Sequence, residues 1–268
     1  MPSLDGVGVQ ARGHTAAVDL VERKGSFSTR HPWEVARAEF FLRLLERHDL
    51  LESGGDWLDA GAGDAWFARQ LRRLLPPAAT ITCWDINYTP EDIEAAGGPD
   101  TEEIGFVADR PTKRFDRVLM LDVIEHVEDD VGFVAATVDD LLVEDGMVLV
   151  SVPAYPSLHS SPDRTLHHYR RYSPVGCRRL LESAGLAVLA SGGLFLSLLP
   201  ARIGQVLVER VRPVKSLSSG VGDWHSGRTA TRVLTRALIT DGRLSLLLSE
   251  RGVSLPGLSY WALCRRSA

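Results

Sequence analysis

Short apolar runs alternate with amphipathic stretches along most of the chain from residue 32 onward. The first amphipathic stretch predicts a helix beginning at Pro32, because apolar residues recur three and four positions apart, at Trp33, Ala36, Phe40, Phe41, Leu44 and Leu45. Apolar runs of strand length follow at 57–60, 80–85, 104–108, 117–121, 147–152, 186–190 and 258–264. Strands that alternate with helices predict an α/β fold with a mainly parallel sheet covered on both faces.

A long insertion before the last predicted strand departs from this alternation. Residues 192–257 contain two apolar stretches, 194–211 and 229–248, joined by a turn-rich segment at 215–227. The pattern predicts a helical insertion, for which three interpretations stay open. It is a lid that excludes water from a site, a surface that rests on a membrane or holds a lipid tail, or an element packed against the core or a twin subunit. We favour a lid over a membrane anchor.

Composition and charge are those of an ordinary globular protein, with 44% hydrophobic and 24% charged residues. Residues 1–30 predict a flexible N-terminal arm, followed by one domain over 31–268. The net charge of −5 gives no reason to expect a nucleic-acid partner. Three scattered cysteines indicate reduced thiols, and with no signal-peptide core at the N-terminus we expect a cytoplasmic protein. The uncharged stretch 183–201 fits a strand followed by a helix better than a membrane span.

A glycine-rich turn follows the first predicted strand, which ends near Asp59. Gly61 and Gly63 carry no Cβ, so the backbone there can approach a bound nucleoside closely. Short Gly-x-Gly turns occur in many loops, and their neighbours decide what they bind. A dinucleotide fingerprint needs a third glycine three positions after Gly63, and Trp66 stands there instead, which counts against NAD. Asp85, at the end of the second strand, is placed to accept hydrogen bonds from ribose hydroxyls, with a solvated aspartate as the alternative.

Several segments together resemble class I S-adenosylmethionine-dependent methyltransferases. They are the turn DAGAG at 59–63, Asp85, and the run FDRVLMLDVIEHV at 115–127. This run is similar to the pattern FDxVxxxDVxEHV of the branch that acts on small molecules and on quinone-like or lipid substrates. The closing LPGLSYW at 255–261 resembles the return into that fold's antiparallel last strand. The resemblance implies a Rossmann-like sheet of seven strands, mostly parallel, with helices on both faces. Ala65, in place of a third glycine, and the long insertion depart from the family pattern.

The resemblance also implies S-adenosylmethionine as the cofactor and gives roles to individual residues. The turn would border the methionine and ribose parts, Asp85 would hold the ribose hydroxyls, and Ile86 would pack on the adenine. Asp109 would meet the adenine amino group, and the end of the fourth strand would approach the methionine ammonium. Arg37 either pairs with the cofactor carboxylate or is a helix-surface arginine. The implied cofactor set is Trp33, Arg37, Asp59, Ala60, Gly61, Gly63, Asp85, Ile86, Asp109, Leu121, Asp122 and Val123.

Histidines are the candidate catalytic groups. Methyl transfer from a sulfonium is a direct displacement that needs nucleophile, methyl and sulfur aligned and water excluded. A base is needed only where the acceptor must lose a proton. His126 is the first candidate for that base, since its neutral imidazole accepts a proton near pH 7, or else it only lines the pocket. His167 and His168 are further candidates. No tight cluster such as HExxH appears, and we expect no metal.

A segment rich in histidine, tyrosine and arginine, 163–174, follows the fifth predicted strand. Its HYRRY run at 168–172 resembles the HxRRY sequence of several similar methyltransferases. The segment lies at the sheet edge where open α/β folds bind ligands, and it is predicted to orient an anionic or hydroxylated acceptor. A salt-bridged loop leading into a helix capped by Ser173 is the alternative. The candidate substrate residues are Tyr155, His168, Arg170, Arg171 and Tyr172.

Competing functions follow from these features. The leading hypothesis is an enzyme, monomeric or homodimeric, that methylates an oxygen, nitrogen or carbon of a small molecule such as a secondary or sugar-like metabolite. Methylation of a lipid-linked or membrane-associated acceptor is the alternative within the same fold. The other classes are an NAD-dependent oxidoreductase, which Trp66 disfavours, and a cofactor-binding protein that does not methylate.

Overall fold

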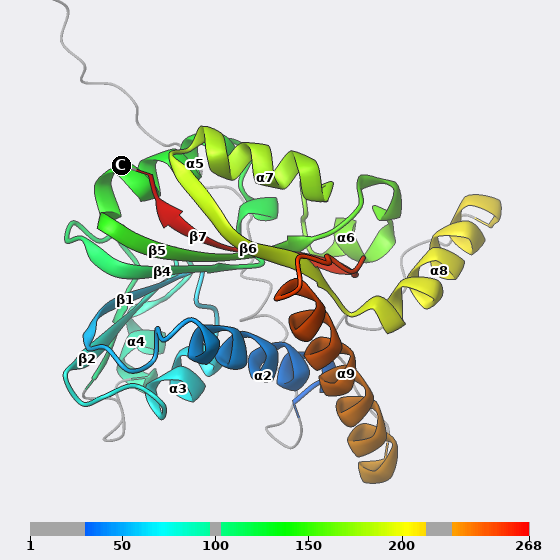
Figure 1. Ribbon diagram of the computed structural model, residues 1–268, viewed down its shortest axis with the longest axis horizontal. Coiled ribbons are helices and arrows are strands. Elements are labelled where there is room, and N and C mark those ends of the chain that lie inside the picture. The colour runs from blue at the N-terminus through cyan, green and yellow to red at the C-terminus, as the bar shows by residue number, and fades with distance from the viewer. Residues whose placement is uncertain (1–29, 97–102, 213–226, 268) are drawn as a thin grey trace, which may run out of the picture.

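The computed structural model describes residues 30–96, 103–212 and 227–267, and a sheet of seven strands forms its centre (Figure 1). The strands lie in the order β3-β2-β1-β4-β5-β7-β6, and β7 runs antiparallel to both of its neighbours. The pairs from β3 across to β5 are all parallel. The strands are β1 (Gly55–Ala60), β2 (Ala79–Trp84), β3 (Ile104–Val107), β4 (Phe115–Leu121), β5 (Leu142–Pro153), β6 (Leu186–Leu194) and β7 (Ser259–Arg266). The predicted Rossmann-like sheet with an antiparallel last strand is confirmed.

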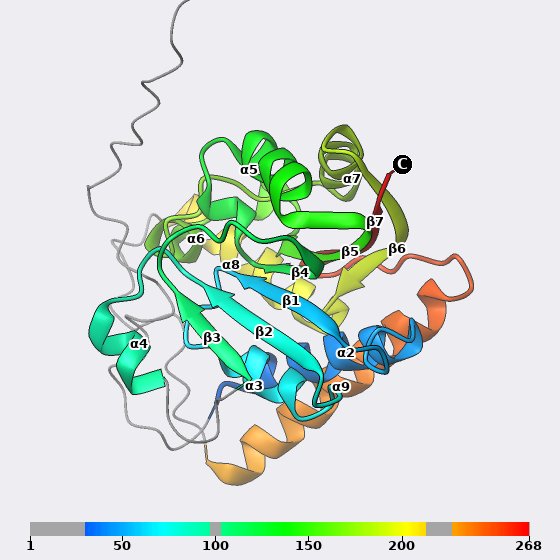
Figure 2. The same cartoon turned by 90° about the vertical axis from the view of Figure 1, so that its left-hand side faces the viewer.

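Helices cover both faces of this sheet (Figures 1 and 2). The helices are α2 (Pro32–Arg47), α3 (Trp66–Arg72), α4 (Pro90–Ala96), α5 (Asp130–Ala136), α6 (Ser161–Thr165), α7 (Pro174–Ser183), α8 (Leu199–Val211) and α9 (Arg228–Ser249). Shorter helical turns are η1 (Ile124–His126), η2 (Thr137–Leu141), η3 (Pro156–Leu158) and η4 (Leu196–Leu198). α2, α3 and α9 pack on one face, and α5 and α7 pack on the other. Because strand side chains alternate, Trp57 faces the first layer and its neighbour Leu58 the second.

β6 is longer than its apolar pattern predicts. The predicted insertion starts at Gly192, but Gly192, Gly193 and Leu194 all pair with β7. A Cβ on Gly193 would lie 2.4 Å from both the nitrogen of Gly257 and the carbonyl oxygen of Leu255, so two backbones touch there. The glycines therefore continue the strand under a close chain crossing instead of ending it.

α9 is joined to the core along its C-terminal half. Leu238 and Leu246 are buried, and Gly242 lies against Phe40 of α2. The buried hydroxyl of Ser245 donates a hydrogen bond to the carbonyl of Gly193 in β6. This half of α9 extends the helical layer beside α2.

α8 packs on α6 and η3, beside the ends of β5 and β6 (Figure 1). Leu199 and Val206 form a small cluster with Leu158 of η3. The carboxylate of Glu209 accepts hydrogen bonds from the backbone N–H and the hydroxyl of Ser161, at 3.0 and 2.7 Å. These contacts fasten α8 to the segment that follows β5.

Two predicted segments lie almost wholly outside the described residues. They are the N-terminal arm, of which Arg30 is described, and the turn-rich part of the insertion, of which Gly227 is described. Within the described ranges, no helix has both the length and the apolar character that crossing a membrane requires.

Candidate functional site

The glycine-rich turn connects β1 to α3 and is bonded to the end of β2. The N–H of Gly61 donates to the carbonyl of Trp84 at 2.7 Å, and the N–H of Gly63 donates to Oδ2 of Asp85 at 3.0 Å. Gly61 has a φ of 68° and Gly63 a φ of 53°, in the left-handed region that favours glycine. A Cβ on Gly61 would also come within 2.7 Å of the Val123 side chain. The turn thus brings Gly61, Gly63, Asp85 and Val123 together.

The carboxylate of Asp85 is held in place by the backbone around it. Asp85 is 9% exposed, and its Oδ1 accepts hydrogen bonds from the backbone and the side chain of Asn87, both at 2.9 Å. Its other oxygen receives the bond from the turn. A carboxylate fixed in this way is oriented before any ligand arrives, which lowers the entropic cost of binding.

The remaining predicted cofactor residues of β1 to β3 differ in exposure. Asp59 and Ala60 end β1 and are buried, at 4% and 1% exposed. Ile86 follows Asp85 and is 70% exposed, and Asp109 is exposed in the loop after β3. Because the carboxyl ends of parallel strands share one edge, all four lie on the edge that carries the turn.

The end of β4 adds an ion pair to this edge. Leu121 ends the strand, and Asp122, with a φ of 58°, pairs with Arg37 of α2. Asp122 also accepts a hydrogen bond from the hydroxyl of Ser151 at 2.8 Å. The guanidinium of Arg37 lies over the ring of Trp33, 4.7 Å from its centroid. α2 therefore delivers Trp33 and Arg37 to the carboxyl end of β4.

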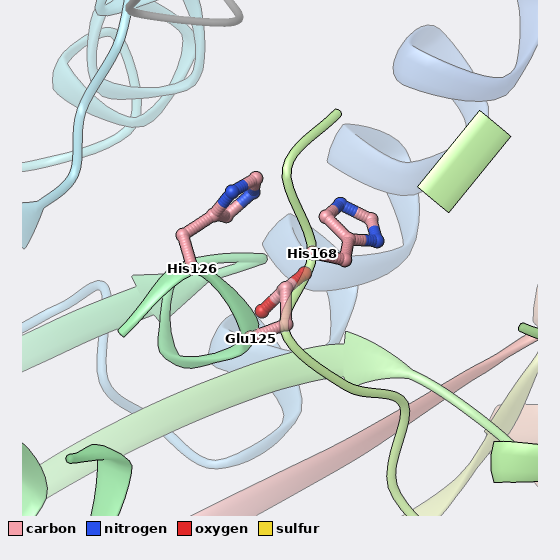
Figure 3. Close-up of side chains that lie close together, drawn as sticks. All are labelled: Glu125, His126 and His168. Atoms are coloured by element: carbon pink, nitrogen blue, oxygen red, sulfur yellow. The ribbon is translucent and has the colours of Figure 1, made fainter. Parts of the chain in front are cut away.

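Beyond Asp122, η1 places Glu125 and His126 beside His168 (Figure 3). The two imidazole rings meet edge to face, with centroids 4.6 Å apart. Glu125 is fully buried, and neither of its carboxylate oxygens has a hydrogen-bond partner in another described residue. Burial raises the pKa of Glu125 to about 8. Burial, and then the neighbouring His168 and His167, lowers the pKa of His126 to about 4, so that His126 is neutral at pH 7.

Asp163 of α6 holds the loop that carries His168. Its carboxylate contacts Nδ1 of His168 at 3.1 Å, accepts a hydrogen bond from Nε of Arg171 at 2.7 Å, and pairs with Arg202 of α8. Burial alone would raise the pKa of Asp163. The hydrogen bond from His168 and the charges of Arg171 and Arg202 outweigh it and hold that pKa well below its usual range. We refer to Asp163, His168, Arg171 and Arg202 as the Asp163 cluster.

Three of the predicted substrate residues are engaged by the protein itself. The hydroxyl of buried Tyr172 donates to Oδ2 of Asp130 at 2.7 Å, and Arg170 pairs with the other oxygen of Asp130 at 2.8 Å. Arg171, besides its bond to the Asp163 cluster, donates to the carbonyl of Ala154 at 3.0 Å. These are the contacts of a salt-bridged loop. Arg170, Arg171 and Tyr172 therefore anchor the loop before α7, and their binding of an acceptor stays a prediction.

Tyr155 was predicted to bind substrate, and His167 was a candidate catalytic group. Tyr155 is half-buried, has a φ of 63°, and donates its backbone N–H to the carbonyl of Tyr172 at 2.8 Å. His167 is exposed. Of the candidate substrate residues, the ring of His168 is the one that contacts His126.

Sequence reasoning singled out neither Glu125 nor the cluster-forming acid Asp163 as a site residue. Both stood inside quoted motifs, but nothing in a linear pattern tells a buried carboxylate from a solvated one. Ser151 left a clearer signal, because it is the polar interruption of the apolar run MVLVSV that forms the end of β5. Arg202 was not singled out from the sequence, and the structure buries it, at 9% exposed, against Asp163.

A comparison with known protein families finds one that matches the part of the chain containing these candidate site residues. The model of a family described as a methyltransferase domain matches residues 33–191, which is more than half of the chain. This range includes the turn, Asp85, η1 and the loop of His168. Among curated proteins, none matches the chain.

Solved structures of methyltransferases share the fold. The chain is 18% identical to a putative sarcosine dimethylglycine methyltransferase from Galdieria sulphuraria, covering 86% of this chain and 85% of that one, with a TM-score of 0.54. An S-adenosylmethionine-dependent methyltransferase from Mesorhizobium loti is 15% identical over 85% and 98%, with a TM-score of 0.51. The putative methyltransferase in complex with the Haloferax volcanii Trm112 activator is 15% identical over 90% and 100%, with a TM-score of 0.50. At such identities the likeness shows the fold alone.

Proposed function

Because this chain belongs to the methyltransferase-domain family and is a class I S-adenosylmethionine-dependent methyltransferase, we propose that its acceptor is a small molecule of the secondary or sugar-like metabolite kind. The acceptor lies between η1 and the loop of His168. The observation that carries the proposal is the meeting of three features at one sheet edge: the glycine turn with Asp85, the Arg37–Asp122 pair, and the His126–His168 pair. The groups proposed to bind the cofactor, which are the turn, Asp85 and the Arg37–Asp122 pair, therefore lie next to the His126–His168 pair, which is proposed to face the acceptor.

In this proposal the nucleoside half of the cofactor lies over the turn. Gly61 and Gly63 leave room for the ribose, whose hydroxyls donate to the fixed carboxylate of Asp85. Ile86, which is 70% exposed, buries its side chain on the adenine, and Asp109 accepts a hydrogen bond from the adenine amino group. The high exposure of Ile86 supports this role, because an apolar side chain gains free energy when a ligand covers it.

The methionine half of the cofactor lies at the end of β4. This half carries an ammonium and a carboxylate, and the Arg37–Asp122 pair offers the two opposite charges side by side. Leu121 and Val123 border the same space, and Trp33 holds the guanidinium of Arg37 from the other side. The sulfonium methyl then points toward η1.

The acceptor-side groups suit a nucleophile that carries a proton. The acceptor's lone pair forms the new bond to the methyl carbon as the carbon–sulfur bond breaks. The electrons of the broken bond stay on sulfur, and the product is S-adenosylhomocysteine. A hydroxyl or ammonium acceptor must also lose a proton. His126, kept neutral at pH 7 by its lowered pKa, has the lone pair to take it.

A lipid-linked acceptor is the second candidate, and exposed apolar residues on α8 favour it. Ile203, Leu207 and Val211 follow one another at intervals of four and are 45%, 54% and 80% exposed. A stripe of this kind, beside the loop of His168, can hold an acyl or prenyl tail. Changing Leu207 to serine reduces methylation of a lipid-linked acceptor and leaves that of a water-soluble acceptor unchanged.

Transfer from methyl-labelled S-adenosylmethionine tests the proposal. Cell metabolites are separated into a water-soluble and a lipid fraction, and each is incubated with the protein and the labelled cofactor. Label that enters a small water-soluble product, and is lost with Asp85→Ala, supports the first candidate. Label confined to the lipid fraction supports the second, and no label in either fraction contradicts both.

A further inference from the structure

Three side chains from two separate segments lie close together (Figure 3). Glu125 and His126 come from η1, and His168 comes from the loop between α6 and α7. One nitrogen or oxygen atom of each lies within 4.8 Å of the corresponding atoms of the other two. The carboxylate of Glu125 is fully buried, and its oxygens find no hydrogen-bond partner in any other described residue. A buried carboxylate without partners is costly unless it holds a proton or meets a cation.

One ring nitrogen of His168, Nδ1, already contacts Asp163, and this contact fixes the orientation of the imidazole ring. Nδ1 of His168 contacts Oδ1 of Asp163 at 3.1 Å. We assign the proton to Nδ1, because the ionised carboxylate can only accept, and this leaves the lone pair of Nε2 free. A carboxylate behind a histidine is the arrangement that orients imidazole ligands in metal sites. Arg171 and Arg202 hold Asp163 in turn, so that the orientation of His168 is built in before any ion binds.

We propose that Glu125, His126 and His168 bind one divalent transition-metal ion. Two imidazoles and one carboxylate are the mixed donor set that Zn²⁺, Co²⁺, Mn²⁺ and Fe²⁺ accept, whereas Mg²⁺ and Ca²⁺ prefer oxygen alone. Three protein ligands leave at least one coordination position open. The proposal departs from the expectation from sequence of no metal, because His168 lies 42 positions after His126 and no linear motif joins them.

The geometry is close to that of a bound ion and needs a small closure. Ligand atoms about 2.1 Å from a tetrahedral ion lie roughly 3.4 Å from one another, so the three side chains move together by about 1 Å. Small rotations of the two half-buried imidazoles make this movement, and the rotation of His168 keeps its contact with Asp163, while the enclosed carboxylate of Glu125 stays in place.

The open position faces the acceptor side, and this part of the inference rests on the proposed function. A transition-metal ion there binds an acceptor through a hydroxyl or phenol oxygen and lowers the pKa of that hydroxyl. The hydroxyl proton leaves to solvent water. The oxygen then forms the bond to the methyl carbon while the carbon–sulfur bond breaks, and His126 acts as a ligand in place of a base. The acceptor class is therefore a hydroxylated small molecule.

The competing explanation is a Glu125 side chain that is simply protonated, with the two histidines packed beside it. The two explanations differ in how glutamine behaves at position 125. Glutamine has the shape of the protonated acid, so a structural role survives Glu125→Gln. Metal binding does not survive it, because the neutral amide is a much weaker ligand than a carboxylate.

Equilibrium binding of Zn²⁺ to the untagged protein, by isothermal titration calorimetry, tests the proposal, with the visible absorption of bound Co²⁺ as a second readout. The variants are Glu125→Gln, His126→Gln and His168→Gln. His48→Gln is the matched control, because His48 is exposed at the far end of α2 from Arg37. The wild type and the control bind one Zn²⁺ per chain with the same affinity. Each of the three site variants binds at least tenfold more weakly and loses the Co²⁺ absorption band.

Zn²⁺ binding that is absent from the wild type, or equal in the wild type and the three site variants, overturns the proposal. S-adenosylhomocysteine binding, measured on the same samples, shows that each variant is folded. It also separates the two claims. A protein that binds S-adenosylhomocysteine but no Zn²⁺ or Co²⁺ keeps the proposed function and loses the metal site, whereas one that binds metal but shows no methyl transfer keeps the site and loses the function.

Discussion

Replacing Asp163 with asparagine tests the Asp163 cluster, which ties α6, α8 and the loop of His168 together. The Asp163 side chain is 1% exposed, and those of its partners Arg171 and Arg202 are 7% and 9% exposed. Asparagine keeps the size of the side chain and removes its charge, so that two buried guanidinium groups lose their counter-ion. Breaking a buried ion pair in this way lowers the free energy of unfolding by about 3–5 kcal/mol.

Urea unfolding at pH 7, followed by tryptophan fluorescence, measures this loss. Asp140→Asn is the matched control, because Asp140 pairs with Arg110 at the surface, where their side chains are 59% and 41% exposed. That change costs at most about 1 kcal/mol. A loss for Asp163→Asn no larger than that of the control refutes the claim that Asp163 compensates buried charge.

The difference in the free energy of unfolding between the wild type and Asp163→Asn also depends on pH. The pKa of Asp163 is lowered in the folded state, so its ionised form stabilises the fold fully above the pKa of an unfolded aspartate, about 4. That stabilisation is lost as the pH falls through the lowered pKa. The difference between wild type and Asp163→Asn therefore shrinks on acidification from about pH 5 to about pH 3, and a difference that grows contradicts the assignment.

Two further substitutions probe the turn and the insertion. Gly61→Ala places a Cβ against Val123 at a φ of 68°, and we expect it to weaken S-adenosylhomocysteine binding in calorimetry by about tenfold or more. The control Gly105→Ala leaves the affinity unchanged, because the space around its Cβ is open. Equal affinities of the two variants would be inconsistent with a close approach of the ligand at the turn. Ser245→Ala leaves the buried carbonyl of Gly193 without its donor and lowers the free energy of unfolding by about 1–3 kcal/mol in urea; an unchanged value would show that α9 does not depend on this bond.

The fold was largely predictable because its elements have simple periods. The alternation of strands and helices indicated the parallel sheet, and α7 begins where Ser173 was expected to cap a helix. The predicted end of the sixth strand was wrong, because contact with another backbone decides the structure there and the residue types do not. Gly192 and Gly193 fell outside the predicted strand at 186–190 and are strand residues, because β6 admits another backbone at Gly193.

The candidate site was predictable only in part, for a related reason. The turn and Asp85 are local features, and the structure brings them into contact. The role of a charged side chain depends on what lies across from it, and the partners of Arg171 and Arg202 come from other elements. For the same reason the meeting of His126 with His168 appears only once the chain is folded.

The central claim is that the turn and Asp85 bind the nucleoside of S-adenosylmethionine. Calorimetric titration of S-adenosylhomocysteine into the wild type, Asp85→Asn and the surface control Asp140→Asn tests it most directly. Hydrogen bonds to a charged group contribute about 1.5–3 kcal/mol, so Asp85→Asn weakens binding of S-adenosylhomocysteine by about tenfold to a hundredfold. Asp140→Asn binds with the affinity of the wild type. Titration of NAD into the wild type gives no heat of binding. Binding of S-adenosylhomocysteine that is absent from the wild type, or undiminished in Asp85→Asn, would contradict the account.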